Sequence, residues 1–244
     1  LPFGKGNQLE LGYRGDFSEL LTDFSVVNDG LANNDFTDVI QYKEKVNALY
    51  SQFGKKFNKL SVLVGLRWED SNIDINSLQK STFINKKYDN FFPSAFLTYE
   101  LKNNSSASIS YSRRIQRPRG RQLIPFNNIS SNINIFQGNP DINPAMTDAI
   151  DLGYMKKWDK LTFSSSLYVN KTTDPFQFIR KKSGRFTSDD VAIITATPIN
   201  LATEYRAGFE FTLNYSPYKW WRLNSNFNYF NIDTKGDYTY TDFL

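Results

Sequence analysis

Apolar and polar side chains alternate one by one through much of the chain. Between residues 60 and 69, every second side chain is apolar: Leu60, Val62, Val64, Leu66 and Trp68. Successive side chains of a β-strand point to opposite faces of its sheet, so this period of two predicts strands with one apolar and one polar face. The pattern recurs in nine segments, at residues 9–13, 37–53, 60–69, 95–101, 106–112, 150–154, 161–170, 206–215 and 221–229.

The links between these segments alternate in length. Short polar turns are predicted at residues 54–59, 102–105, 159–160 and 216–219. Long links are predicted at residues 28–35, 77–90, 119–144 and 181–189. We therefore expect an all-β fold, an antiparallel up-and-down meander of about nine strands with short turns at one end and long loops at the other.

Residues 37–53 fit two patterns. Val39, Tyr42, Val46, Leu49 and Phe53 match the spacing of one helical face. A strand over the same residues places the charged Glu44 among apolar side chains. We favour the strand, because the neighbouring segments are strands and this one ends in a short turn, and a helix remains the alternative.

Composition narrows the chemistry that this chain can perform. Its 244 residues include neither Cys nor His, and 29 basic against 25 acidic residues give a net charge of +4. These two absences exclude disulfides, thiolate nucleophiles, Ser-His-Asp triads and ordinary zinc sites. We predict that the chain is not an enzyme and has no catalytic residues, no cofactor and no metal. So small a net charge does not indicate a nucleic-acid partner.

The alternation fits both a soluble sandwich and a membrane barrel. The barrel is favoured by a polar face rich in Ser, Thr and Asn, which suits a hydrated lumen. It is also favoured by strands of about ten residues, close to the roughly 25 Å apolar band of such barrels. Aromatic residues gather beside the short turns, where an interfacial girdle belongs, namely Tyr99, Trp158, Tyr215, Tyr218, Trp220 and Trp221. A soluble all-β module that binds a ligand or carbohydrate is the alternative.

Several short motifs occur in an order that resembles a known family. They are residues 44–50 (EKVNALY), 65–69 (GLRWE), 90–95 (NFFPSA), 109–118 (ISYSRRIQRP), 122–126 (QLIPF), 138–144 (GNPDINP), 151–154 (DLGY) and 208–210 (GFE). This succession resembles the C-terminal barrel of TonB-dependent receptors, in particular the outer-membrane β-barrel family of Bacteroidota.

The resemblance implies an outer-membrane receptor of Gram-negative bacteria that takes up a nutrient such as a siderophore, glycan or peptide. It implies contact with membrane lipid, a plug domain, TonB and a surface lipoprotein partner. Nine strands do not close such a barrel, so we expect residues 1–244 to be one part of a large transmembrane β-barrel whose plug and remaining strands lie elsewhere in a longer chain. A structural or secretion-associated barrel without transport is a second alternative.

Two groups of residues are candidates for contact with partners. A basic cluster at Arg113, Arg114, Arg117, Arg119 and Arg121 leads into the longest link, where structural pairing or contact with an anion is expected. Candidate loop contacts to substrate are Arg117, Arg119, Arg121, Phe126, Asn128, Phe136 and Asn139. The alternative is a loop folded on itself through Asn and Pro turns.

A second group lies on the polar face of the predicted strands. These candidate lumen or plug contacts are Arg67, Glu69, Arg114, Arg206, Glu210 and Arg222. Cross-strand ion pairing is the alternative role for them. Glu69 and Glu210 resemble a pair of catalytic carboxylates only if the fold brings them together, and nothing in the sequence predicts that.

Overall fold

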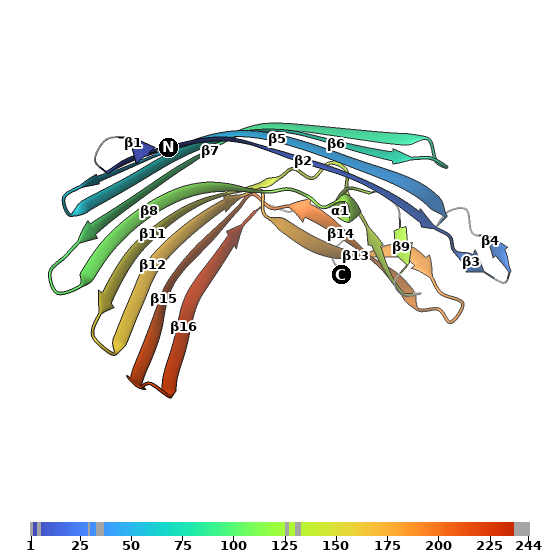
Figure 1. Ribbon diagram of the computed structural model, residues 1–244. Helices are drawn as coiled ribbons and strands as arrows, with labels where there is room; N and C mark the ends of the chain where they lie inside the picture. The colour runs from blue at the N-terminus through green and yellow to red at the C-terminus, as the bar shows by residue number, and fades with distance from the viewer. Residues whose placement is uncertain are drawn as a thin grey trace.

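Nine long strands form one antiparallel sheet in the computed structural model, which describes residues 2–3, 6–28, 30–32, 37–124, 127–129 and 133–236 (Figure 1). Each long strand pairs with the preceding and following long strands of the chain, so the predicted meander is confirmed. The strands are β2 (Asn7–Phe24), β5 (Asp38–Phe57), β6 (Leu60–Ser77), β7 (Thr82–Glu100), β8 (Ser105–Gln116), β11 (Ala145–Lys157), β12 (Leu161–Thr173), β15 (Thr203–Tyr218) and β16 (Trp221–Lys235). The two-residue strand β1 (Pro2–Phe3) extends the sheet beside β2.

Strands near the N-terminus are longer than the alternation predicted. The segment at residues 37–53, for which a helix was the alternative, lies from residue 38 onward in the 20-residue strand β5. The predicted link at residues 77–90 is wrong, because β6 and β7 remain paired up to Ser77 and Thr82. Only residues 78–81 form the turn between them. The four strands β2, β5, β6 and β7 therefore extend well beyond the ends of the others.

The two faces of the sheet differ in chemistry. On β6, the even-numbered side chains from Leu60 to Trp68 share one face with Leu97 and Tyr99 of β7, as the register requires. Many of the large apolar side chains on this face are exposed, including Leu66, Phe91 and Leu152. Further along β6 the same face carries Asp70, Asn72 and Asp74. The apolar side chains thus form a band that runs from the short turns about nine residues up each strand.

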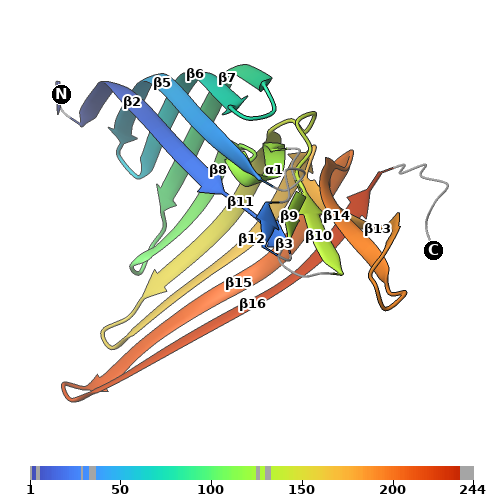
Figure 2. The same ribbon diagram turned by 90° about the vertical axis from the view of Figure 1, so that its right-hand side faces the viewer.

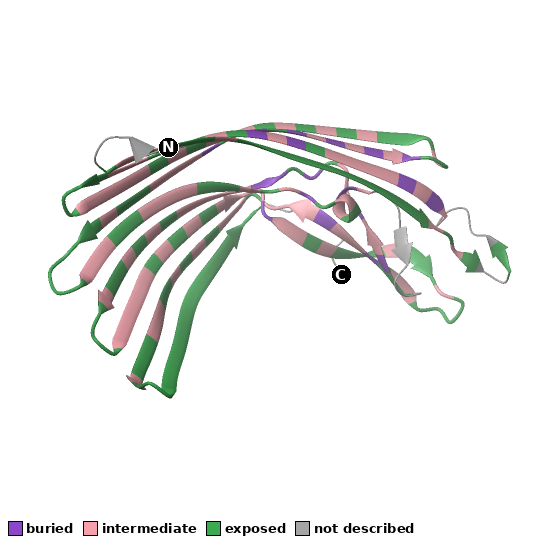
Figure 3. Cartoon of the chain, viewed as in Figure 1, coloured by how far each residue is buried: buried purple, intermediate pink, exposed green. Residues whose placement is uncertain are grey.

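A folded-back segment covers part of the opposite, concave face. The segment joins β8 to β11 and contains the single-turn helix α1 (Gly120–Leu123), which lies under the arch of the sheet (Figures 1 and 2). Leu123 and Ile142 of this segment pack against Ile40, Ile73 and Ile75 of β5 and β6, and all five are almost fully buried. Figure 3 shows this burial along β5 and β6, whereas β16 is exposed along its whole length.

Gly138 brings the two arms of this segment together. A Cβ at this position would lie 2.2 Å from the carbonyl oxygen of Ile124 and 2.8 Å from that of Arg121. Only glycine allows so close an approach of two backbones. The turn after it is held by Asn139, whose side-chain oxygen accepts a hydrogen bond from the backbone N–H of Asp141 at 2.9 Å.

A second, four-stranded sheet joins two of the long connections. Its strands are β13 (Phe176–Phe186), β14 (Ala192–Asn200), β10 (Asn134–Gln137) and β9 (Asn127–Ile129). The predicted link at residues 181–189 is therefore wrong, because most of it belongs to the β13–β14 hairpin. β10 pairs with β14 in parallel, which ties the β8–β11 connection to the β12–β15 connection. The link predicted at residues 28–35 lies partly outside the described residues and contains the short strands β3 (Val27–Asn28) and β4 (Leu31–Ala32).

The two strands β7 and β8 of the main sheet are paired only near their short turn and separate beyond it. β7 pairs with β6 over its whole length but with β8 only from Ser94 to Glu100. Pro93 lies directly at the point of separation, and its missing N–H cannot contribute to a ladder. Beyond the pair of Ser94 with Ser112, β8 is no longer paired with β7, and its end leads into the folded-back segment.

Candidate binding site on the concave face

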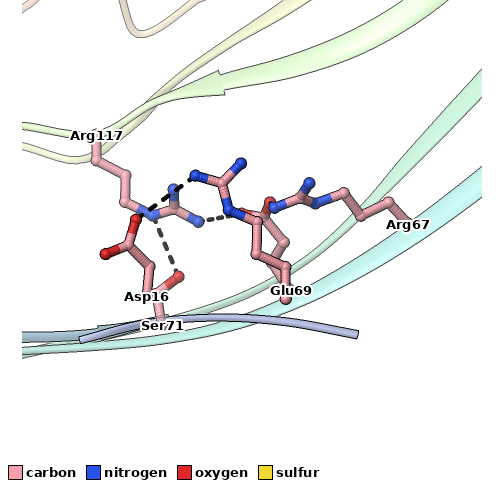
Figure 4. Close-up of polar contacts among 6 residues, drawn as sticks. Asp16, Arg67, Glu69, Ser71 and Arg117 are labelled. Carbon is pink, nitrogen blue, oxygen red and sulfur yellow. Dashed lines mark hydrogen bonds and ion pairs between the residues drawn. The ribbon is translucent and has the colours of Figure 1, made fainter. Parts of the chain in front are cut away.

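Two arginines share one buried carboxylate on the concave face. Arg67 Nη2 lies 2.5 Å from Glu69 Oε1, and the guanidinium of Arg117 pairs with Glu69 Oε2. Arg117 Nε also donates a hydrogen bond to Ser71 Oγ at 3.1 Å. Figure 4 shows Arg117 reaching across to β6, with Glu69 between the two guanidinium groups. The Glu69 side chain is only 7% exposed, so these contacts neutralise a charge that is otherwise costly to bury.

Strand register explains how these side chains meet. Arg67, Glu69 and Ser71 alternate along β6 and therefore share the concave face, opposite the apolar side chains of the same strand. Arg117 follows the last residue of β8 and precedes the buried Pro118, where the chain turns back over the sheet. Arg117 thus attaches the start of the folded-back segment to β6.

A cavity of about 410 Å³ opens beside this cluster. Arg14 and Asp16 of β2 contribute to its wall and form an exposed ion pair at 3.7 Å. The remaining lining residues are Glu44, Val46, Arg67, Glu69, Phe92, Arg113, Arg114, Ile115 and Arg117. The volume falls within the usual range of small-molecule sites.

Two tyrosines adjoin the cluster above the apolar band. Tyr42 donates a hydrogen bond to Glu44 Oε2 at 3.0 Å. Burial raises the pKa of Tyr42 well above its ordinary value, and the neighbouring Glu44 carboxylate raises it further. Burial also raises the pKa of Tyr88. Both phenols therefore stay protonated near neutral pH and act as neutral hydrogen-bonding groups.

The remaining lumen candidates lie elsewhere on the concave face. Arg206 of β15 pairs with Glu204 at 3.6 Å, and Glu210 accepts a 3.3 Å hydrogen bond from Ser166. Arg222 lies in β16, near the short turn between β15 and β16. Four strands separate Glu210 on β15 from Glu69 on β6, so the two carboxylates do not form a pair. Among the described residues, no group of acidic side chains has the arrangement of a metal site.

The basic cluster is divided between different surroundings. Arg117 is bound to Glu69, and Arg114 lines the cavity. Arg113 also lines the cavity, and its guanidinium lies 3.7 Å from Asp148 of β11. Arg119 precedes α1, and its backbone N–H donates to the side chain of Gln122 at 2.9 Å.

The other loop candidates lie mainly in the folded-back segment. The guanidinium of Arg121 stacks over the ring of Phe136, 4.5 Å from its centroid. Asn139 Nδ2 donates to the backbone oxygen of Pro198 at 3.2 Å, which joins the two long connections. Phe126 and the side chain of Asn128 lie outside the described residues.

Sequence reasoning missed several residues of the cavity. Arg14, Asp16 and Glu44 come from β2 and β5, and Phe92 and Ser71 complete the surroundings. The signal for Arg14 and Asp16 was present, since both alternate with Leu11 and Tyr13 and therefore face away from the apolar band. Nothing in the sequence indicated that Arg117 would cross to β6, because that contact depends on how the long connection folds.

Comparison of the chain with known protein families shows in which class of protein this sheet occurs. Residues 1–243 match the model of the outer membrane protein beta-barrel family. The chain belongs to this family. Its barrel sheet therefore lies in the bacterial outer membrane, and the convex apolar band faces lipid. No helix in the described part of the chain is long and apolar enough to cross a bilayer.

Solved structures share the fold of this barrel portion at low sequence identity. The copper transporter OprC is 14% identical with a TM-score of 0.71, and the alignment covers 93% of this chain and 36% of OprC. The ferric-catecholate import receptor Fiu from E. coli is 11% identical with a TM-score of 0.66, covering 95% and 36%. The FrpB iron transporter from Neisseria meningitidis is 10% identical with a TM-score of 0.63, covering 96% and 34%. No curated protein sequence matches the chain.

The barrel portion spans only about a third of the length of these structures. Membership of an outer-membrane barrel family does not support the alternative of a soluble sandwich. The expectation of an outer-membrane barrel is confirmed by the family.

Proposed function

We propose that this chain forms part of the wall of a TonB-dependent receptor that takes up a nutrient across the outer membrane. The observation that supports this most is the combination of a lipid-facing convex band with a polar concave face. A wall of this chemistry encloses water and a substrate, and its fold is that of proteins described as a copper transporter and iron transporters. The rest of the barrel, a plug domain and the TonB-contacting segment belong to other parts of the parent protein in this proposal.

The concave residues far from the folded-back segment are the proposed plug contacts. Arg206, Glu210 and Arg222 lie on β15 and β16, where the concave face is open in Figure 1. Their weak or absent pairing within the sheet leaves hydrogen-bonding capacity for a domain inside the barrel. The folded-back segment and the β12–β15 connection form the proposed entrance. A substrate and a surface lipoprotein partner would approach the barrel there. A Bacteroidota source is part of the same proposal.

Growth and uptake measurements test the proposal. A strain that lacks the complete parent protein is compared with its wild type on iron, copper, glycan and peptide sources supplied at limiting concentration. We expect a defect on one source, and we expect loss of TonB to reproduce that defect. Unchanged uptake of all four classes, combined with increased leakage of a dye through the outer membrane, would instead support a structural barrel without transport.

A further inference from the structure

The cavity beside Glu69 holds more cationic than anionic groups. Its lining includes five arginines, against three acidic residues, Asp16, Glu44 and Glu69. The arginines are Arg14, Arg67, Arg113, Arg114 and Arg117, and Arg113 pairs with Asp148, which is not part of the lining. Asp16 pairs with Arg14, and Glu69 accepts both Arg67 and Arg117. Arg114 has no ion pair or hydrogen bond with any described residue, so its charge is uncompensated within the described part of the chain.

Arg67 presents a second guanidinium group to the cavity, and its side chain is 33% exposed. Its Nη2 binds Glu69, whereas its Nε is buried and has no hydrogen-bond partner among the described residues. A ligand in the cavity therefore meets the accessible part of this guanidinium group and not Nε. A carboxylate or similar oxyanion is the acceptor whose geometry matches a guanidinium group.

The rest of the lining is apolar. Phe92 and Val46 are each 8% exposed and lie beside the charged groups, and Ile115 completes this side of the cavity. A flat aromatic surface next to guanidinium groups suits a ligand that has a compact apolar body and ionised substituents. Inorganic phosphate would leave this apolar surface without a contact.

We propose that this cavity binds a small organic polyanion through its carboxylate groups, with Arg114 and Arg67 as direct ligands and Phe92 as the surface for its apolar body. The proposal deepens the transport function proposed above and rests on it, because the bound anion would be the nutrient or a group carried by it. Arg117 and Glu69 hold the folded-back segment in place and so shape the cavity without supplying free charge.

Calorimetric titration of the complete parent protein in detergent micelles tests this site. The probe is trimesate, a benzene ring with three carboxylates, and its neutral triamide is the control ligand. We expect trimesate to bind and the triamide not to bind. Replacing Arg114 by Gln should weaken trimesate binding by about tenfold or more, the usual effect of losing one charge-assisted contact. The variant Arg114→Lys should recover part of the affinity, since it restores the charge without the planar fork.

A matched control separates the cavity from the lumen as a whole. The variant Lys157→Gln removes an equal charge from the concave face at a place outside the cavity, opposite Thr162 of β12, and should leave trimesate affinity unchanged. Thermal unfolding of all variants checks that Arg114, which is exposed, does not support the fold. Equal weakening by Lys157→Gln, or unchanged affinity in Arg114→Gln, would overturn the anion site.

The two proposals fail in different ways. Uptake of a nutrient in cells without trimesate binding in vitro would leave the transport function standing and remove the anion site. Trimesate binding that depends on Arg114, in a protein whose deletion affects no uptake, would keep the site and remove the transport function. Trimesate binding that appears only after the plug is deleted would show that the plug occupies the cavity, and would overturn the proposal.

Discussion

Single side chains on adjacent positions of β15 have opposite surroundings. Phe211 lies in the middle of the convex band and packs against the rings of Phe163, Phe209 and Phe227. Its neighbour Thr212 faces the concave side, opposite Ser164 of β12. A one-residue step along this strand therefore moves a side chain from lipid to water.

Arginine at these two positions should have unequal consequences. The variant Phe211→Arg should lower the free energy of unfolding by about 2–4 kcal/mol, because it places a charge near the bilayer midplane. Thr212→Arg should be tolerated, since the lumen is hydrated. Urea titration of the parent barrel in phospholipid vesicles measures both. Equal losses for the two variants would contradict the assignment of faces.

The position of the folded-back segment depends on Glu69, whose carboxylate binds Arg117 at the start of that segment. Glu69→Gln leaves Arg67 and Arg117 without their common counter-charge, and loss of one partner from a buried pair typically costs about 3 kcal/mol or more. We expect faster proteolysis after Arg119 or Arg121 in this variant. Asp16→Asn is the matched control, because its ion pair with Arg14 is exposed and contributes about 0–1 kcal/mol.

The phenol of Tyr42 makes the same region sensitive to alkaline pH. Burial raises its pKa in the folded protein above the ordinary value of a tyrosine, so the folded state holds the phenolic proton more tightly than the unfolded state. The resulting stabilisation is complete below pH 10 and declines as the pH rises above it toward the folded pKa. The protection of the amides of the folded-back segment, relative to their intrinsic base-catalysed exchange rates, should therefore fall above pH 10, and Tyr42→Phe should reduce this pH dependence. An unchanged alkaline response in Tyr42→Phe would assign it to another group.

At the scale of elements, the small core under the folded-back segment holds α1 against the sheet. Leu123→Ala should cost about 3 kcal/mol, because it opens a cavity among Ile40, Ile73 and Ile75. Hydrogen exchange should then increase over α1 and its flanks while the long strands keep their protection. Leu78→Ala is the control, since Leu78 is 52% exposed in the turn between β6 and β7. Similar exchange in both variants would show that the core does not anchor this segment.

The long strands could be predicted where one face meets lipid. Leu60 to Trp68 show the period of two clearly, because only one face of β6 is apolar there. Beyond Asp70 the apolar positions change parity, and Ile73 and Ile75 face the concave side. Because of this change of parity, the alternation breaks off before residue 77, and the continuation of β6 and β7 was interpreted as a link.

The same change explains the ambiguity of residues 37–53. Ile40, Tyr42 and Val46 of β5 face the folded-back segment, whereas Leu49 and Phe53 face lipid. Because the apolar side chains of β5 change from one face to the other midway along the strand, their spacing resembles that of one face of a helix. The partner of the upper half is a distant loop, so the position of Leu123, Ile142 and Arg117 did not follow from local pattern.

At the scale of the whole molecule, the exposed apolar band governs solubility. Large side chains such as Leu66, Phe91 and Leu152 are each about half exposed along the convex face. A continuous apolar surface of this extent is not stable in water. We expect the chain to remain monodisperse only in detergent or lipid, as measured by size-exclusion chromatography with light scattering. A monodisperse species in plain buffer would contradict the lipid-facing assignment.

The parallel pairing of β10 with β14 has a consequence for assembly. It joins connections that leave the membrane sheet at different hairpins, and the Asn139–Pro198 bond beside it spans 59 residues of chain. Closing so large a loop is entropically unfavourable until the strands that carry it are already adjacent. The four-stranded sheet should therefore form last, after β8, β11 and β12 have inserted. Protease resistance of this sheet would then report the completion of membrane insertion.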